Sequence, residues 1–341
     1  MRARLIWACV IGFALLAATT GGGVLYGWSA LDQPLTIAQD GEWLEVEPGS
    51  SLGAISRELA ARRIVEHPGV LRYFGRLRGD ATRIHAGEYR LMPGLTSRSL
   101  LDQLVAGQVY LHQMAVIEGW RFEELRSALR AHPAVIPSEL ESDEIMEALG
   151  APGVHPEGQF APDTYSFARG TPELEILEQA HRTLQDQLGV IWNERSPVVA
   201  VETPYEALIL ASIIEKETAL TTERRQISGV FSRRLQRGMR LQTDPTVIYG
   251  LGADFDGNLR RVDLNRDTPY NTYTRRGLPP TPIALAGSDA LRAAVDPDES
   301  LALYFVATGL ADGSHTFSAT LEEHNQAVAA YLRRLRARDS Q

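Results

Sequence analysis

The chain contains 341 residues, enough for two domains, and its 44% hydrophobic and 23% charged residues are typical of a folded globular protein. The formal net charge of −9 argues against a nucleic-acid partner, because such proteins need a basic surface to neutralise phosphates. Cys9 is the only cysteine, which excludes a disulfide framework and a cysteine-based metal site.

The first 31 residues predict a membrane anchor. From Leu5 to Leu31 no residue is charged, and a membrane-spanning helix needs about 20 mostly apolar residues. Arg2 and Arg4 flank the near end, so the positive-inside rule places the N-terminus in the cytoplasm and the body in the periplasm or outside the cell. A cleaved signal peptide is the alternative, but its apolar core is ordinarily shorter, at roughly 7–15 residues. We expect a single-pass anchor in the inner (cytoplasmic) membrane.

A polar linker at 32–42 leads to a small predicted domain at 43–112. Apolar spacing and turn residues predict, in order, a strand at 43–47, helices at 51–63 and 70–78, a strand at 85–91, and a helix at 97–106 with Ser97 as its N-cap. The order strand, helix, helix, strand resembles a LysM module, a class that binds N-acetylglucosamine chains. A folded spacer without sugar affinity is an equally good interpretation.

The second predicted domain occupies residues 113–335, before a short tail at 336–341. Its first elements are a strand at 114–117, a helix at 122–131, an ordered surface loop at 154–167 and an amphipathic helix at 174–188. With the first domain, these elements predict an α+β fold.

Residues 203–218 carry the strongest helix signal. Thr203 is a candidate N-cap, Pro204 suits the first helical position, and Glu206 completes a capping box. Residues 207–214 are apolar except for Ser212, a pattern typical of a helix that is buried on all sides.

This buried helix runs into the carboxylates Glu215 and Glu217. Desolvation would raise the pKa of a carboxyl group there, and cleavage of a glycosidic bond needs a carboxylic acid that is protonated near neutral pH. Glu215 lies above the small residues Ala211 and Ser212, which would leave room for a sugar, whereas Glu217 lies above two isoleucines. On the helix pattern alone, two solvated charges at a helix end remain the simpler interpretation.

Several ordered segments resemble the endolytic murein transglycosylase family (MltG / YceG-like). These segments are 118–120 (Glu-Gly-Trp), 162–165 (Pro-Asp-Thr-Tyr), 203–218, 238–250, 269–273 (Pro-Tyr-Asn-Thr-Tyr), 277–283, 303–307 and 316–325. The resemblance extends from the anchor to about residue 335 and is densest between 203 and 325. Gln159 departs from the family pattern, which usually has an aromatic residue there, so a stacking contact at this position is in doubt.

The resemblance implies a lyase with a lysozyme-like helical core and a LysM-like domain between that core and the membrane. Glu215 matches the catalytic glutamate of the family. It would protonate the oxygen between N-acetylmuramic acid and N-acetylglucosamine, then act as a base while the muramic C6 hydroxyl attacks C1. The product is a 1,6-anhydro end, no water is consumed, and no cofactor is implied.

Seven further residues are candidate substrate contacts. Amide, hydroxyl and carboxyl groups can bond to the acetamido and hydroxyl groups of sugars, and aromatic rings can pack on sugar faces. The candidates are Gln242, Thr243, Asp244, Asn271, Tyr273, Glu157 and Asp163. The alternatives are a helix cap for Asp244, core or turn packing for Tyr273, and loop structuring for Glu157 and Asp163. No His, Asp and Glu group has the spacing of a metal site.

Two other functions compete with the lyase. The first is a muramidase that uses water and takes Asp244, Glu217 or Glu157 as its second carboxylate. The second is a non-catalytic, membrane-tethered scaffold that binds the wall. The expected partners are peptidoglycan glycan strands and the cytoplasmic membrane, and a tether near the site of strand synthesis would also suit peptidoglycan synthases.

Overall fold

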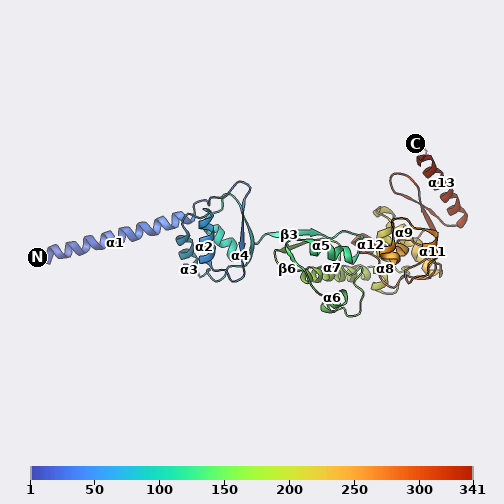
Figure 1. Ribbon diagram of the computed structural model, residues 1–341, viewed down its shortest axis with the longest axis horizontal. Coiled ribbons are helices and arrows are strands. Elements are labelled where there is room, and N and C mark those ends of the chain that lie inside the picture. Colours follow the sequence, from blue (N-terminus) through green and yellow to red (C-terminus); the bar gives the residue numbers. More distant parts are fainter. Residues whose placement is uncertain (1, 340–341) are drawn as a thin grey trace. The chain divides into compact units, whose positions relative to one another are not determined.

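The computed structural model describes residues 2–339 and has a mixed α+β fold (Figure 1). The chain forms two compact units. The first contains the residues up to His112 together with Ser166–Gly170, and the second contains Gln113–Tyr165 and the chain from Thr171 onward. The return of Ser166–Gly170 to the first unit was not predicted from the sequence.

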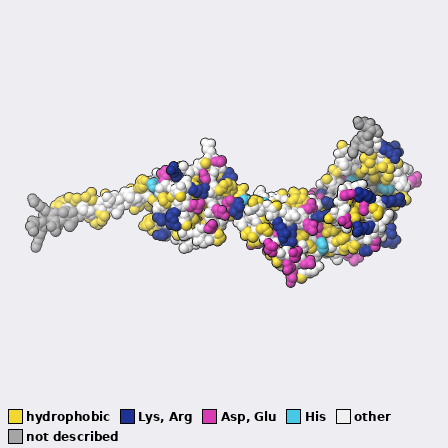
Figure 2. Space-filling view, viewed as in Figure 1, with side chains coloured by type: hydrophobic (Ala, Val, Ile, Leu, Met, Phe, Trp, Pro, Cys, Tyr) yellow, Lys and Arg dark blue, Asp and Glu magenta, His cyan; other side chains and the backbone are white. Residues whose placement is uncertain are grey.

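Helix α1 (Arg2–Leu31) opens the first unit. Its segment Val10–Leu31 is the one described helix that is long and apolar enough to cross a membrane. Hydrophobic and uncharged atoms cover its described surface (Figure 2). Its last turns pack on the rest of the unit, where the Tyr26 hydroxyl lies 3.1 Å from His67 Nε2 and Trp28 meets Phe74 edge to face.

The remainder of the first unit follows the predicted order of strand, helix, helix and strand. The elements are β1 (Glu42–Val46), α2 (Leu52–Ala61), α3 (Pro68–Leu77), β2 (Gly87–Leu91) and α4 (Ser97–Ala106). Strands β1 and β2 pair antiparallel, with Leu44 opposite Tyr89. The apolar positions of the three helices close over this pair as one core, in which Leu44, Leu59 and Leu100 are fully buried.

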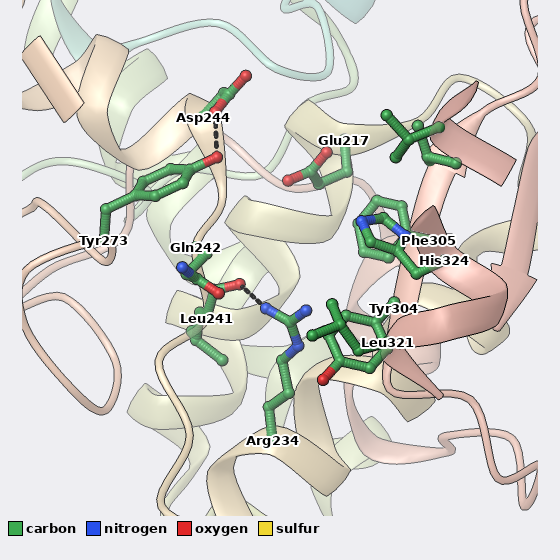
Figure 3. Close-up of a pocket in the computed structure, with 12 residues that line it drawn as sticks. Glu217, Arg234, Leu241, Gln242, Asp244, Tyr273, Tyr304, Phe305, Leu321 and His324 are labelled. Carbon is green, nitrogen blue, oxygen red and sulfur yellow. Dashed lines mark hydrogen bonds between the residues drawn. The ribbon is translucent and has the colours of Figure 1, made fainter. Parts of the chain in front are cut away.

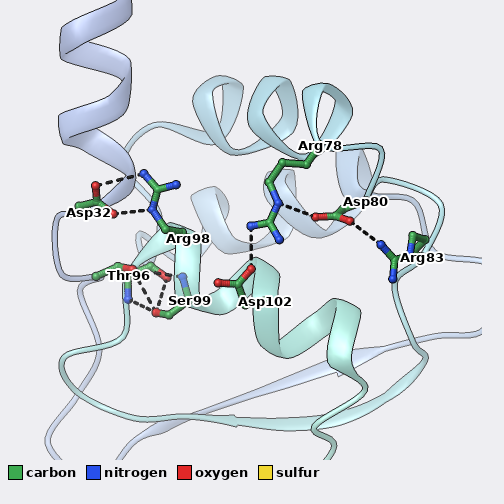
Figure 4. Close-up of polar contacts among 8 residues, drawn as sticks. All are labelled: Asp32, Arg78, Asp80, Arg83, Thr96, Arg98, Ser99 and Asp102. Atoms are coloured by element: carbon green, nitrogen blue, oxygen red, sulfur yellow. Dashed lines mark hydrogen bonds and ion pairs between the residues drawn. The ribbon is translucent and has the colours of Figure 1, made fainter.

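Polar contacts connect the elements of this unit (Figure 4). Arg98 on α4 pairs with Asp32 at 2.7 Å, directly after α1. The N-cap of α4 is Thr96 and not the predicted Ser97. The Thr96 hydroxyl accepts from the Ser99 N–H at 3.2 Å, and the Thr96 N–H donates to the Ser99 hydroxyl at 2.8 Å. A serine side chain thus takes the place of the usual glutamate in the capping box.

The chain continues into the second unit through β3 (Leu111–Ala115), α5 (Phe122–Ala131), β4 (Val135–Ile136), α6 (Ser142–Ala148), β5 (Thr164–Ala168), β6 (Thr171–Pro172) and α7 (Glu173–Asn193). Strand β3 pairs with β5, and β4 pairs in parallel with β6. The predicted surface loop at 154–167 is wrong in two respects. Its end forms β5, and residues 156–161 are buried, with Phe160 stacked on Phe122.

The rest of the second unit is arranged around helix α8 (Pro204–Glu217). The other elements are α9 (Thr221–Gln236), α10 (Asp244–Leu251), η1 (Gly252–Asp254), α11 (Arg261–Asn265), α12 (Ser288–Val295), β7 (Tyr304–Ala307), β8 (His315–Ser318) and α13 (Leu321–Asp339). Helices α7, α9, α10 and α12 pack against α8, and all residues from Ala207 to Ile214 are buried, as predicted. This packing fixes the end of α8, where the two glutamates lie.

The predicted capping box of α8 forms only in part. The Thr203 hydroxyl accepts from the Glu206 N–H at 3.2 Å. The Glu206 carboxylate, however, accepts from the Glu202 N–H one residue earlier, rather than from Thr203. The cap still satisfies one of the helix's unpaired N–H groups, and Pro204 has no N–H to satisfy.

Candidate active site

Glu215 and Glu217 occupy different surroundings at the end of α8. Two residues along a helix of 3.6 residues per turn place their side chains roughly 200° apart around the axis. Glu215 therefore faces α9 and the start of α12, whereas Glu217 faces the loop before α10.

Each oxygen of the Glu215 carboxylate accepts a hydrogen bond from the protein. Arg224 Nη2 on α9 donates to its Oε1 at 2.8 Å, and the Gly287 N–H before α12 donates to its Oε2 at 3.0 Å. Both charged side chains of the pair are 6% exposed. Burial raises the pKa of Glu215, while the Gly287 N–H and the Arg224 charge oppose that shift. These contacts fasten α8 to α9 and α12.

The Glu217 carboxylate lines an open pocket of about 460 Å³. The hydroxyl of Thr243 donates to its Oε1. Burial raises the pKa of Glu217 to about 7, the Thr243 hydrogen bond opposes the shift, and the charge of Asp244 adds to it. Among residues 2–339 no Lys, Arg or His forms an ion pair with Glu217, in contrast to Glu215. Glu217 lines this pocket and Glu215 does not.

One wall of this pocket comes from Gln242, in the loop before α10, and from Asp244, the first residue of α10 (Figure 3). Gln242 has a φ of +52°, a backbone conformation that is uncommon for residues other than glycine and is often found at functional sites. Its N–H donates to the Thr272 carbonyl at 3.2 Å. Thr243 is buried behind it, and the Thr272 hydroxyl accepts from the Thr243 N–H at 3.0 Å.

Tyr273 joins the same wall. Its hydroxyl donates to Asp244 Oδ1 at 2.6 Å (Figure 3). The aromatic ring, the amide of Gln242 and the carboxyl of Asp244 thus surround the space in front of Glu217. Hydrogen-bonding groups and an aromatic ring around a carboxyl group suit the recognition of a neutral, hydroxyl-rich ligand.

The opposite wall was not predicted from the sequence. It is built by Tyr304, Phe305 and Val306 of β7 and by Leu321, His324 and Val328 of α13, with Arg234 of α9 beneath it (Figure 3). His324 stacks on Tyr304 with ring centroids 5.2 Å apart. Arg234 is one of many arginines in the chain, and no local pattern marks it, because its place depends on the packing of β7 onto α9.

Asn271 does not line this pocket. Its side-chain amide donates to the carbonyls of Asp263, Leu264 and Arg266, at 3.2, 3.1 and 2.7 Å, and its Oδ1 accepts from the Tyr273 N–H at 2.8 Å. The residue is 1% exposed. Asn271 therefore holds the loop that presents Tyr273.

Glu157 and Asp163 lie away from the Glu217 pocket. Glu157 lines a separate cavity of about 520 Å³ with Arg121 and Tyr249, and accepts from the Phe122 N–H at 3.0 Å. Burial raises its pKa to about 7. Asp163 is exposed, and its Oδ1 accepts from the adjacent Thr164 N–H at 2.6 Å. The structure brings neither carboxylate to the same pocket as Glu217.

Comparisons with known proteins identify the family of the chain. Residues 44–330 match the model of the YceG-like family. The chain is 30% identical over 331 residues to an endolytic murein transglycosylase of Bacillus subtilis (strain 168), with 92% of this chain and 91% of that protein covered. It is 26% identical to an endolytic murein transglycosylase of Streptococcus pneumoniae (strain ATCC BAA-255 / R6), with 95% and 65% covered.

A solved structure gives the same result. The crystal structure of a YceG-like protein from Listeria monocytogenes matches with a TM-score of 0.53 at 28% identity, covering 85% of this chain and 99% of that one. The family model matches residues 44–330, and the Bacillus subtilis relative is 30% identical over nearly the whole chain. The chain therefore belongs to the YceG-like family.

Proposed function

We propose that this chain is an endolytic peptidoglycan lytic transglycosylase, a lyase that cleaves the bond between N-acetylmuramic acid and N-acetylglucosamine within nascent strands and ends their elongation. The relatives named endolytic murein transglycosylase support the reaction class. The observation that carries the proposal is Glu217, a carboxyl group with a pKa of about 7 that is open to a pocket of about 460 Å³. A pKa near the working pH suits a group that must both give and take a proton.

In the proposed reaction Glu217 acts twice. It first donates its proton to the glycosidic oxygen as the bond from that oxygen to C1 of the muramic residue breaks. The carboxylate then takes the proton of the C6 hydroxyl while the bond between O6 and C1 forms. Atoms balance without water, and the acid is regenerated. One carboxylate suffices because the attacking hydroxyl is tethered to the reacting carbon and is already close to it.

Our assignment of the acid to Glu217 differs from the motif-based prediction of Glu215. Glu215 is held by Arg224 and by the Gly287 N–H, so proton donation to a substrate would require this buried pair to open. Burial raises the pKa of Glu215 as well, which keeps it as the second candidate. Gln242, Asp244 and Tyr273 are proposed substrate contacts, Thr243 a positioning residue for Glu217, and Asn271 a support for the loop. For Glu157 we propose contact with a more distant part of the strand, and for Asp163 only loop structuring.

The finer architecture and location are also proposals. The pairing of β1 with β2 around α2 and α3 supports a LysM-like first unit, and the central α8 supports a lysozyme-like core in the second. We propose that α1 anchors the chain in the cytoplasmic membrane with the second unit exported, near peptidoglycan synthases. Protease added to intact spheroplasts should digest the second unit, and full protection would refute the orientation.

Digestion of purified murein tests the reaction. We expect strands with 1,6-anhydro-muramic ends in mass spectra of the products. Reducing ends alone would replace the lyase with the hydrolytic muramidase, for which Asp244 is the second carboxylate that lines the pocket. Binding of strands without any cleavage would instead favour the non-catalytic scaffold.

A further inference from the structure

Arg234 is a buried cation on the floor of the Glu217 pocket. Its side chain extends from α9 and is 7% exposed. Its Nε donates to the Leu303 carbonyl at 2.7 Å, and its Nη1 donates to the Leu241 and Arg240 carbonyls at 2.8 and 3.2 Å. The guanidinium group therefore connects Leu303, directly before β7 on one side of the pocket, with the loop before α10 on the other.

The charge of Arg234 has no carboxylate partner in the part of the chain that the structure describes, although its guanidinium lies over the Tyr304 ring, 5.1 Å from the ring centroid. Among residues 2–339 no Asp or Glu forms an ion pair with it, and its Nη2 atom makes no hydrogen bond. Its neighbour Arg233, by contrast, pairs with Asp298 at 3.1 Å. A buried charge without a counter-ion is costly, and arginine remains charged at any physiological pH.

A second unsatisfied group lies on the same pocket. The Nδ1 atom of His324 is buried and has no hydrogen-bond partner among the described residues. Figure 3 shows the Arg234 guanidinium between Gln242 on one side and Tyr304 with His324 on the other, with Glu217 facing the same space. Two nitrogen atoms without hydrogen-bond partners among the described residues, Arg234 Nη2 and His324 Nδ1, thus belong to residues that line the pocket of the proposed acid.

We propose that Arg234 and His324 form a carboxylate-binding subsite that recognises the stem peptide of a muramyl unit next to the cleaved bond. This inference rests on the proposed function. In a peptide-bearing strand the lactyl carboxyl group of each muramic residue is tied up in the amide bond to its stem peptide, so the carboxylates of the stem peptides are the anions that such a strand can offer. A guanidinium N–H group matches a carboxylate oxygen better than any neutral sugar group, because the hydrogen bond is charge-assisted.

The subsite predicts that the enzyme distinguishes strands whose stem peptides carry free carboxylates from strands whose stem-peptide carboxylates are amidated. The experiment measures kcat/KM of the full chain on un-crosslinked, peptide-bearing strands with free carboxylates and on the same strands after chemical conversion of those carboxylates to amides. We expect the strands with free carboxylates to be preferred by at least about tenfold, the effect of one charge-assisted hydrogen bond. Equal values would overturn the subsite, whereas the absence of 1,6-anhydro ends from both substrates would instead overturn the proposed function.

Two neighbouring arginines provide the matched variants. In Arg234→Gln the preference should fall toward one, with the loss expressed mainly in KM for strands with free carboxylates. In Arg233→Gln, which loses a similar contact to the Ala302 carbonyl but lies outside the pocket, the preference should persist. A preference that survives in Arg234→Gln would overturn the role of this residue.

Arg234→Gln also removes hydrogen bonds to backbone carbonyls, so a loss of preference in this variant could come from a disturbed fold. A second experiment therefore tests the subsite in the wild-type enzyme. A synthetic stem peptide with free carboxylates should inhibit cleavage of peptide-bearing strands, and the same peptide with its carboxylates amidated should inhibit at least about tenfold more weakly. Equal inhibition by the two peptides would overturn the subsite without any variant.

Discussion

The last turn of α8 carries two glutamates, one on each side, whose carboxyl groups have very different partners. Glu215 is paired with a buried arginine and accepts a backbone N–H, so its oxygens are occupied by the protein. Glu217 has only the Thr243 hydroxyl and a pocket in front of it. Burial raises the pKa of both groups. A raised pKa alone therefore does not identify a general acid; access to a substrate and the lack of a permanent cation distinguish the two.

The largest effect should come from Glu217→Gln. Glutamine keeps the shape and can accept the Thr243 hydrogen bond, but it cannot donate a proton to the leaving oxygen. We expect kcat for strand cleavage to fall by about 10²–10⁴-fold, the usual contribution of a general acid, while binding of strands persists. Release of 1,6-anhydro products measures the rate, and a variant with near-normal turnover would return the role to Glu215.

The pH dependence of the stability of Glu217→Gln tests whether the pKa of Glu217 is raised in the folded protein. The folded-state pKa of Glu217 is about 7, above its ordinary value of 4.5, so between these pH values the folded protein binds more protons than the unfolded chain. Stability is then lost as pH rises through this window. Glu217→Gln should remove that loss and show a flatter dependence of the unfolding midpoint on pH between about 4.5 and 7. A steeper dependence would contradict the raised pKa.

Glu215→Gln should act mainly on stability. It leaves Arg224 buried with only the half-exposed Glu118, 3.6 Å away, as a charged partner. Breaking a buried ion pair by removing one partner costs about 3 kcal/mol. We expect denaturant unfolding to show this loss, and any decrease in cleavage to follow the folded fraction. Full stability with abolished cleavage would favour Glu215 as the acid.

Thr243→Val should produce a smaller change on the Glu217 side alone. The Thr243 hydroxyl donates to the Glu217 carboxylate and so favours its ionised form. Valine cannot donate, so the pKa of Glu217 should rise further. Because the proposed acid must be protonated, the alkaline limb of the kcat profile should move to higher pH. If the alkaline limb of the kcat profile moves to lower pH or stays in place, the ionisation of Glu217 does not determine that limb.

Local patterns predicted most of the elements because neighbours in the chain determine them. The apolar run at Ala207–Ile214 predicted a buried α8, and the spacing at residues 122–131 predicted α5. The choice between Glu215 and Glu217 could not be made in this way. It depends on Arg224 and Gly287, and Gly287 is 72 residues along the chain from Glu215. The side of the pocket with Arg234 and His324 could not be predicted either, because β7 meets α9, and α13 meets β7, only in the folded unit.

The smallest effect should come from Thr203→Ala, at the end of α8 away from both carboxylates. Loss of this N-cap costs about 1 kcal/mol, and the cap lies roughly 18 Å from Glu215 at 1.5 Å per residue. We expect a slightly lower unfolding midpoint with an unchanged cleavage rate per folded molecule and an unchanged pH profile. The variant thus separates general destabilisation of α8 from effects at its far end. A loss of turnover comparable to that of Glu217→Gln would mean that turnover reports the stability of α8, and would remove the basis for assigning the acid.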